Sequence, residues 1–222
     1  MKTVRVGLVG VGTVGRGVFE VLRRNGEEIA RRIGREIIVV AASARNVEKA
    51  TKFLGPQVKV HADPLDVVRD ENVDVVIELI GGTTTARMLI EESIALMKPV
   101  VTANKALIAE HGNELFAQAK ANGSIVTYEA AVAGGIPIIK ALREGLAANR
   151  IDSVAGIVNG TTNFILSEMR YKGISFQEAL ADAQRLGYAE ADPTFDIEGI
   201  DAGQRLAIIA AAVSYTHLTL PT

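Results

Sequence analysis

Five carboxylates lie close together near the end of the chain, in a segment with no basic residue before Arg205. They are Glu190, Asp192, Asp196, Glu198 and Asp201. A solvated helix spreads its acids and pairs them with basic residues one turn away, but Pro193 and Gly199 interrupt this segment. Acids held on an irregular loop suit recognition of a cationic group, such as the ammonium of an amino acid. An acidic surface loop without a ligand is the alternative interpretation.

Three glycines follow the first expected strand, residues 4–9, with the spacing GxGxxG. They are Gly10, Gly12 and Gly15, with Thr13 and Val14 between the last two. In such a pattern the first glycine permits a tight turn, the second lets the backbone approach a pyrophosphate, and the third allows close helix–strand packing. The helix that follows turns its N-terminus to the phosphates. The segment therefore predicts a dinucleotide site, although glycines alone could mark only a turn.

The end of the second expected strand, residues 37–42, bears on which dinucleotide binds. A carboxylate there would accept a hydrogen bond from the ribose 2′-hydroxyl of NAD, but this strand does not end in an acid, and Glu36 lies at its other end. Arg45 is instead placed to meet a 2′-phosphate, with Lys49 or Lys52 as helpers, which favours NADP over NAD. An ordinary solvated arginine is the alternative interpretation of Arg45.

Two further strand ends are expected at the same edge of the sheet. Gly81 follows a strong fourth strand at 73–80 and leaves room for a nicotinamide ring, with Thr83 beside it. Glu78 in this strand is interpreted as a satisfied buried polar group rather than a catalyst. Lys105 follows the fifth strand, where a lysine can hold a substrate oxygen or transfer a proton; surface charge is the alternative.

The segment 159–166 follows another expected strand and opens a helix. Asn159 and Thr161 supply an amide and a hydroxyl suited to orienting a small polar ligand. The alternative is a helix cap, in which Thr161, Thr162 or Asn163 satisfies the first helix amides.

Apolar runs separated by helical patterns extend over the first 134 residues. Such runs indicate an α/β fold with a Rossmann-type, doubly wound parallel sheet that is covered on both faces. We expect strands at 4–9, 37–42, 58–61, 73–80, 100–102 and 125–128, and helices at 13–24, 85–97 and 111–122. A glycine-rich link near Gly134 then leads to a truncated α+β substrate and dimerisation domain.

The expected division is a dinucleotide-binding domain at 1–134, a partial second domain at 135–213 and an anomalous tail at 214–222. In the second domain we expect helices at 138–147, 161–172, 176–186 and 201–213, and a strand at 151–158. The tail loses the helical period and is interpreted as a truncation scar or fused sequence.

Composition excludes several classes of protein. The chain of 222 residues has no cysteine, which rules out disulfides, thiolate metal sites and cysteine nucleophiles. Its net charge is −2 and its basic residues are scattered, so no nucleic-acid partner is expected. No signal peptide or membrane-length apolar run is present, so we expect a cytoplasmic protein without a membrane partner. His61 and His111 are too isolated for a metal site.

Taken together, these segments resemble homoserine dehydrogenase from residue 4 to about residue 212. The resemblance rests on the glycine pattern, on 102–105, 129–137 and 159–166, and above all on the acidic segment 187–201. It implies interconversion of L-homoserine and L-aspartate 4-semialdehyde with NAD or NADP, on the route to threonine and methionine. A homodimer is implied for the full-length protein.

The resemblance also implies roles for individual residues. Glu190 and Asp201 are implied as substrate ligands, with Asp196 in support, and Lys105 as the lysine that contacts both cofactor and substrate. A monovalent-cation site, taken to be for sodium, is implied for the side chain of Glu129 and the carbonyls of Val132, Gly134 and Ile136.

Two departures from the family pattern leave the activity of this chain open. The family's acidic motif closes with a proton-donating lysine where this chain has Arg205, and a guanidinium stays protonated. The family's catalytic region also continues beyond residue 212. A non-catalytic NADP-binding fragment is therefore one alternative function, and a dehydrogenase of another amino acid, such as aspartate, is a second.

Overall fold

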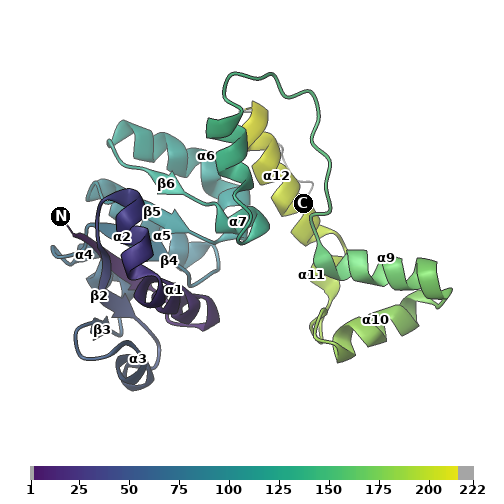
Figure 1. Ribbon diagram of the computed structural model, residues 1–222, viewed down its shortest axis with the longest axis horizontal. Helices are drawn as coiled ribbons and strands as arrows, with labels where there is room; N and C mark the ends of the chain where they lie inside the picture. The colour runs from purple at the N-terminus through teal and green to yellow at the C-terminus, as the bar shows by residue number, and fades with distance from the viewer. Residues whose placement is uncertain (1–2, 215–222) are drawn as a thin grey trace. The chain divides into compact units, whose positions relative to one another are not determined.

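The computed structural model describes residues 3–214, which divide into two compact units, Met1–Gly135 and Ile136–Thr222 (Figure 1). Each unit has a hydrophobic core of its own. The tail expected at 214–222 lies outside the described residues, apart from the backbone of Ser214.

A six-stranded parallel sheet forms the centre of the first unit, with the strand order β3-β2-β1-β4-β5-β6. The strands are β1 (Val4–Val9), β2 (Ile37–Ser43), β3 (Lys59–His61), β4 (Val75–Glu78), β5 (Val100–Thr102) and β6 (Val126–Thr127). The strand order reverses at β1, so the carboxyl ends of β1 and β4 flank the crevice in which such sheets bind ligands. The expected doubly wound α/β fold is confirmed.

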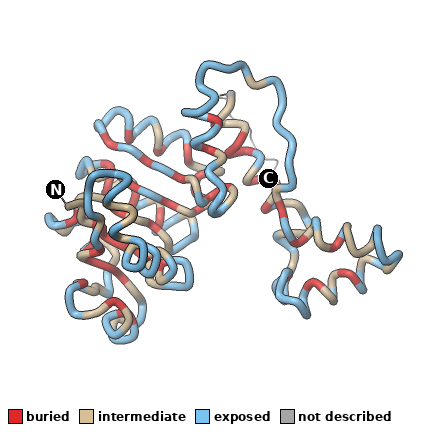
Figure 2. The backbone as a smooth tube through the Cα atoms, in the orientation of Figure 1, coloured by how far each residue is buried: buried red, intermediate tan, exposed pale blue. Residues whose placement is uncertain are grey.

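Both faces of this sheet are covered, which explains why its strands are apolar without alternation. Leu8 of β1 packs with Phe19 on one face, whereas Val9 packs with Val67 and Leu89 on the other. In Figure 2 the buried residues run along the strands and along the helix sides that face them. The helices are α1 (Thr13–Arg24), α2 (Gly26–Ile33), α3 (Val47–Leu54), α4 (Pro64–Arg69), α5 (Thr84–Ala95), α6 (Lys105–Ala121) and α7 (Ala130–Ala133).

Helix boundaries differ from the sequence prediction where polar caps decide them. The helix expected at 111–122 begins at Lys105, because the Asn104 side chain accepts a hydrogen bond from the Leu107 amide at 3.2 Å. The short helices α3 and α4 were not predicted, and Asn46 and Asp63 cap them in the same way.

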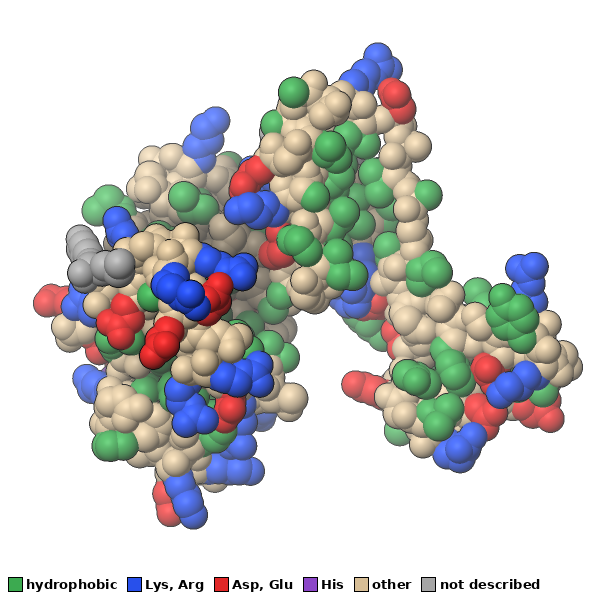
Figure 3. Space-filling view, viewed as in Figure 1, with side chains coloured by type: hydrophobic (Ala, Val, Ile, Leu, Met, Phe, Trp, Pro, Cys, Tyr) green, Lys and Arg blue, Asp and Glu red, His purple; other side chains and the backbone are tan. Residues whose placement is uncertain are grey.

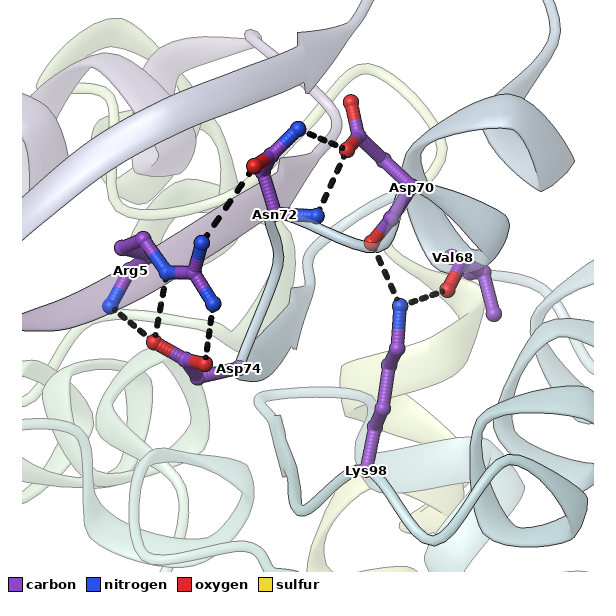
Figure 4. A network of polar contacts seen from close by, with 6 residues as sticks. All are labelled: Arg5, Val68, Asp70, Asn72, Asp74 and Lys98. Carbon is purple, nitrogen blue, oxygen red and sulfur yellow. Dashed lines mark hydrogen bonds and ion pairs between the residues drawn. The ribbon is translucent and has the colours of Figure 1, made fainter.

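A polar network joins the amino ends of the strands, at the edge opposite the crevice (Figure 4). Arg5 at the start of β1 makes a two-point ion pair with Asp74, with nitrogen–oxygen distances of 2.8 and 3.0 Å. The ammonium of Lys98 donates to the carbonyls of Val68 and Asp70 at 2.7 and 2.6 Å. Burial lowers the pKa of Lys98. These contacts fix the ends of β1, β4 and β5 without involving the crevice.

The second unit is helical over the residues that the structure describes. Its elements are α8 (Ile138–Lys140), the π-helical turn η1 (Ala141–Gly145), α9 (Gly160–Lys172), α10 (Phe176–Arg185), α11 (Thr194–Ile197) and α12 (Ile200–Ser214). Ile165 of α9 packs against Ala179 and Ala183 of α10 to form its core. Ser175 and Glu178 form a capping box at the start of α10.

The prediction of a strand at 151–158 is wrong, because these residues form neither helix nor strand. A strand needs a neighbour to satisfy its amides and carbonyls, and the described part of the second unit supplies none. None of the helices in residues 3–214 is long and apolar enough to cross a membrane.

Candidate functional site

The turn after β1 has the shape that a bound pyrophosphate requires. Gly10 has φ of +100°, and a Cβ there would lie 3.0 Å from the Leu79 carbonyl oxygen. A Cβ on Gly15 would lie 2.0 Å from the Gly10 carbonyl oxygen, so only glycine permits this packing of α1 on the turn. A Cβ on Gly12 would meet nothing within 4 Å, so the space beside this residue is open. Gly12 caps α1 without a side-chain hydrogen bond, which leaves the first helix amides open to an anion.

A cavity of about 790 Å³ opens beside this turn, at the carboxyl ends of β1, β2 and β4. Of the predicted cofactor residues, Gly10, Gly12, Thr13, Arg45 and Gly81 line it. Lys49 also lines the cavity. This volume and this mixture of open amides, glycines and cations fit a dinucleotide.

The other predicted cofactor residues do not line this cavity. Val14 is exposed on α1, Gly15 packs beneath the turn, and Thr83 precedes α5 as its cap. Lys105 is the first residue of α6 and is half-buried.

A buried carboxylate organises the loops that carry Gly81 and Lys105. Glu78 is fully buried, and its carboxylate accepts hydrogen bonds from the Thr102 hydroxyl at 2.6 Å and the Ile80 amide at 2.8 Å. The Asn104 side chain then donates to the carbonyl of Gly82 at 2.6 Å. The interpretation of Glu78 as a satisfied polar group is confirmed, and it links the ends of β4 and β5.

The second unit joins its acidic segment to the start of α9 through one asparagine. The Oδ1 of Asn159 accepts from the Thr162 amide and hydroxyl, both at 2.8 Å, and so caps α9. Its Nδ2 donates to Asp196 at 2.7 Å and to Asp201 at 3.0 Å. The helix cap is therefore real, but Asn159 forms it, rather than the threonines or Asn163.

Arg205 completes this network. Its Nε donates to Oδ2 of Asp201 at 2.8 Å, and its Nη2 approaches Oδ1 at 3.4 Å. The Asp201 side chain is 8% exposed, so this carboxylate lies in a poorly solvated place with a cation beside it. Charge-assisted contacts of this kind are stronger than neutral ones.

The remaining residues of the acidic segment differ in their surroundings. Thr161 donates to the Tyr188 carbonyl at 2.7 Å, and Gln184 donates to the Glu190 carbonyl at 3.1 Å, which ties the segment to α9 and α10. The Asp192 carboxylate accepts from the hydroxyl and amide of Thr194, and these hydrogen bonds lower its pKa. Glu190 itself is exposed.

The residues implied in a cation site lie where the two units meet in the sequence. Glu129 precedes α7, Val132 lies in it, and Gly134 follows it with φ of +59°. Ile136 begins the second unit, where its carbonyl accepts from the Ile138 amide at 2.8 Å. Residues 3–214 hold no cluster of three His, Cys, Asp or Glu side chains that could bind a metal.

Sequence reasoning missed two residues that the structure places at these sites. Arg16 lines the cavity from α1, and Gln184 of α10 supports the acidic segment. Arg16 lies just beyond the glycine pattern, and the ring that it contacts, Phe53, is distant in the sequence, so no local signal marks Arg16.

Family models match both parts of the chain. Residues 10–129 match the model described as "Homoserine dehydrogenase, NAD binding domain", and residues 137–221 match "Homoserine dehydrogenase". A homoserine dehydrogenase of Pseudomonas aeruginosa is 60% identical over 212 residues, which are 95% of this chain and 48% of that protein. This chain thus spans about half the length of the curated relatives it matches.

Solved structures agree with the sequence matches. The crystal structure of a homoserine dehydrogenase from Thiobacillus denitrificans is 62% identical with a TM-score of 0.89, and covers 95% of this chain and 49% of its own. A hyperthermophilic archaeal homoserine dehydrogenase in complex with NADPH is 28% identical with a TM-score of 0.84, over 97% of this chain and 71% of its own. By its sequence and by the fold of its NAD-binding domain, the chain belongs to the homoserine dehydrogenase family.

Proposed function

We propose that this chain carries the dinucleotide-binding domain and part of the catalytic domain of an enzyme that interconverts L-homoserine and L-aspartate 4-semialdehyde with NADP. One observation carries the proposal: a single chain holds both a dinucleotide-sized cavity at a glycine turn and a buried network of amide, carboxylates and guanidinium on an acidic segment. We assign residues 1–134 and 135–213 to the two domains.

The proposed chemistry divides the work between the two sets of residues. NADP supplies the hydride acceptor for oxidation of the substrate's terminal alcohol. Gly12 and the open amides of α1 hold the pyrophosphate. Lys105 holds the substrate oxygen and transfers the proton of that oxygen. Glu190 and Asp201 anchor the polar groups of the amino acid, and Asp196 supports them.

Asn159 and Thr161 act on the substrate indirectly in this proposal. The Asn159 amide makes four hydrogen bonds inside the protein, which is the full capacity of an amide, so it positions the carboxylates. Thr161 positions the segment by its bond to the Tyr188 carbonyl.

NADP rather than NAD is favoured by the residues that follow β2. Arg45 and Lys49 line the cavity, and the last residue of β2 is the buried Ser43 rather than an acid. The archaeal relative was solved with NADPH, which supports the same preference. NAD is the alternative.

Two further assignments come from the family resemblance alone. We propose a sodium site at Glu129 and the carbonyls of Val132, Gly134 and Ile136, since one carboxylate with several carbonyls suits a hard cation. We also propose that the full-length protein is a homodimer. A cytoplasmic location stays a prediction.

The proposed activity is tested by NADP-dependent oxidation of L-homoserine, followed at the absorbance of reduced nicotinamide. We expect a rate with L-homoserine, none with L-aspartate or L-serine, and a loss of at least about tenfold in kcat/KM for Asp201→Asn, because a buried charged contact is removed. Asp152→Asn is the matched control, since Asp152 is highly exposed on the second unit. A rate with L-aspartate instead would support the other dehydrogenase and overturn the proposal.

A second candidate function is NADP binding without turnover, which Arg205 favours because a guanidinium stays protonated. Binding of NADPH without oxidation of any amino acid in the same assay would support this candidate. Failure of both binding and oxidation would reject both functions.

A further inference from the structure

Arg16 is held against α3 by an aromatic ring. Its guanidinium carbon lies 4.8 Å from the centre of the Phe53 ring, and Phe53 packs in turn on Phe19, with ring centres 5.8 Å apart. A cation over a ring face is attracted to it. The half-buried Arg16 side chain is therefore directed from α1 toward the helix that follows Arg45.

Three cations meet at this side of the cavity. Arg16, Arg45 and Lys49 all line it, and none of the three makes an ion pair with a carboxylate within residues 3–214. Several other arginines of the first unit do make ion pairs, as Arg5 does with Asp74 and Arg69 does with Glu92. In Figure 3, blue Lys and Arg side chains lie over the part of the molecule where Figure 1 shows α1 and α3, with red Asp and Glu side chains among them. A site with three uncompensated cations is complementary to a multiply charged anion.

We propose that Arg16, positioned by Phe53, is a third cationic ligand of a phosphate monoester on the adenosine ribose, and that it helps Arg45 and Lys49 to select NADP over NAD. This inference rests on the proposed function, because it deepens the same dinucleotide site. A guanidinium can keep one face on an aromatic ring while its edge donates two hydrogen bonds to phosphate oxygens. NAD carries a hydroxyl at that position, so the three cations add little to its binding free energy.

The test is the dissociation constant of NADPH and of NADH, measured by nicotinamide fluorescence for the 222-residue chain and its variants. We expect Arg16→Met to weaken NADPH binding by about tenfold or more and NADH binding by less than about twofold. Arg16→Lys should fall between the parent and Arg16→Met. Arg23→Met is the matched control, because Arg23 lies on the same helix with a side chain that is 69% exposed.

Phe53→Leu separates the positioning of the guanidinium from its charge. This variant keeps an apolar side chain and all three cations but removes the ring, and we expect NADPH to bind about threefold more weakly with NADH unchanged. Circular dichroism melting confirms that each variant is folded. Competition by adenosine 2′,5′-bisphosphate and by AMP should show the same pattern, since these two probes differ only in the 2′-phosphate.

Two outcomes would overturn the inference. One is that Arg16→Met weakens the binding of NADPH and of NADH equally, which would place Arg16 beside a part of the nucleotide that the two share. The other is that it weakens the binding of neither. A parent chain that binds neither nucleotide would instead reject the dinucleotide site itself, so the two failures are distinguishable.

Discussion

Arg205, which holds the Asp201 carboxylate, is the residue in which this chain departs most from the chemistry that its family resemblance implies. The guanidinium holds the Asp201 carboxylate from one turn further along α12, while Asn159 holds it from the start of α9. A lysine at position 205 could reach the same carboxylate with a group that exchanges its proton. The present pair can position and neutralise the carboxylate, but it supplies no proton donor of suitable acidity.

We therefore expect Arg205→Lys to raise the rate of homoserine oxidation. General acid–base catalysis contributes about 10²–10⁴-fold, so kcat should rise by at least about tenfold, with a smaller change in KM. Steady-state kinetics over a range of pH measure both. Arg185→Lys serves as the control, since Arg185 makes a similar ion pair with Asp182 on the exposed side of α10. An unchanged or lower kcat in Arg205→Lys would assign the proton transfer elsewhere.

At the scale of elements, buried polar groups fix how loops leave the sheet and how helices begin. Glu78 ties the end of β4 to the end of β5, and Asn159 ties α9 to α11 and α12. Each of these side chains is buried and fully engaged, so its loss would leave unpaired partners. The amino edge of the sheet has a corresponding network in which Asp70 ends α4 and holds Asn72.

From the lowered pKa of the Asp70 carboxyl we predict that the stability of the fold depends on pH. The backbone hydrogen bond from Asn72 holds the pKa of Asp70 below its ordinary value of 3.8. A carboxyl with a lowered folded pKa stabilises the protein above its unfolded pKa, and this contribution is lost as pH falls through the folded value. Asp70→Asn should thus be less stable than the parent by roughly 0.5 kcal/mol at neutral pH, since solvent screens this partly exposed carboxylate, with the difference vanishing in acid.

Urea unfolding followed by circular dichroism, repeated from neutral pH down to about pH 3, measures this difference. Glu20→Gln provides the control, since Glu20 is exposed on α1. A gap between Asp70→Asn and the parent that stays constant with pH would show that the carboxylate charge has no part in it.

At the scale of the whole molecule, the fold of the first unit was predictable because its signals are local. Apolar runs marked all six strands, and the glycine spacing marked the turn after β1. The start of α6 at Lys105 was not predictable from periodicity, because the Asn104 cap sets it. The strand expected at 151–158 failed for the opposite reason: apolar residues alone do not form a strand where no neighbour pairs with it.

The sequence indicated which residues belong to the candidate sites better than it indicated which of them contact one another. The glycines, Arg45 and the acidic segment could be recognised by type and spacing. Three long-range contacts could not be recognised in this way: the stacking of Arg16 on Phe53, and the two hydrogen bonds from Asn159 to Asp196 and Asp201. These depend on how separate helices pack, which no single segment of sequence encodes.

The central claim is that hydride passes between the terminal carbon of L-homoserine and the nicotinamide of a bound NADP. The most direct test uses L-homoserine with deuterium on that carbon, NADP and an excess of the chain, with mass spectrometry of the nucleotide after a single turnover. We predict that deuterium appears in the reduced nucleotide, and in greater yield with Arg205→Lys. A chain that binds NADP but transfers no deuterium, as parent or as Arg205→Lys, would contradict the claim and leave a cofactor-binding protein without this activity.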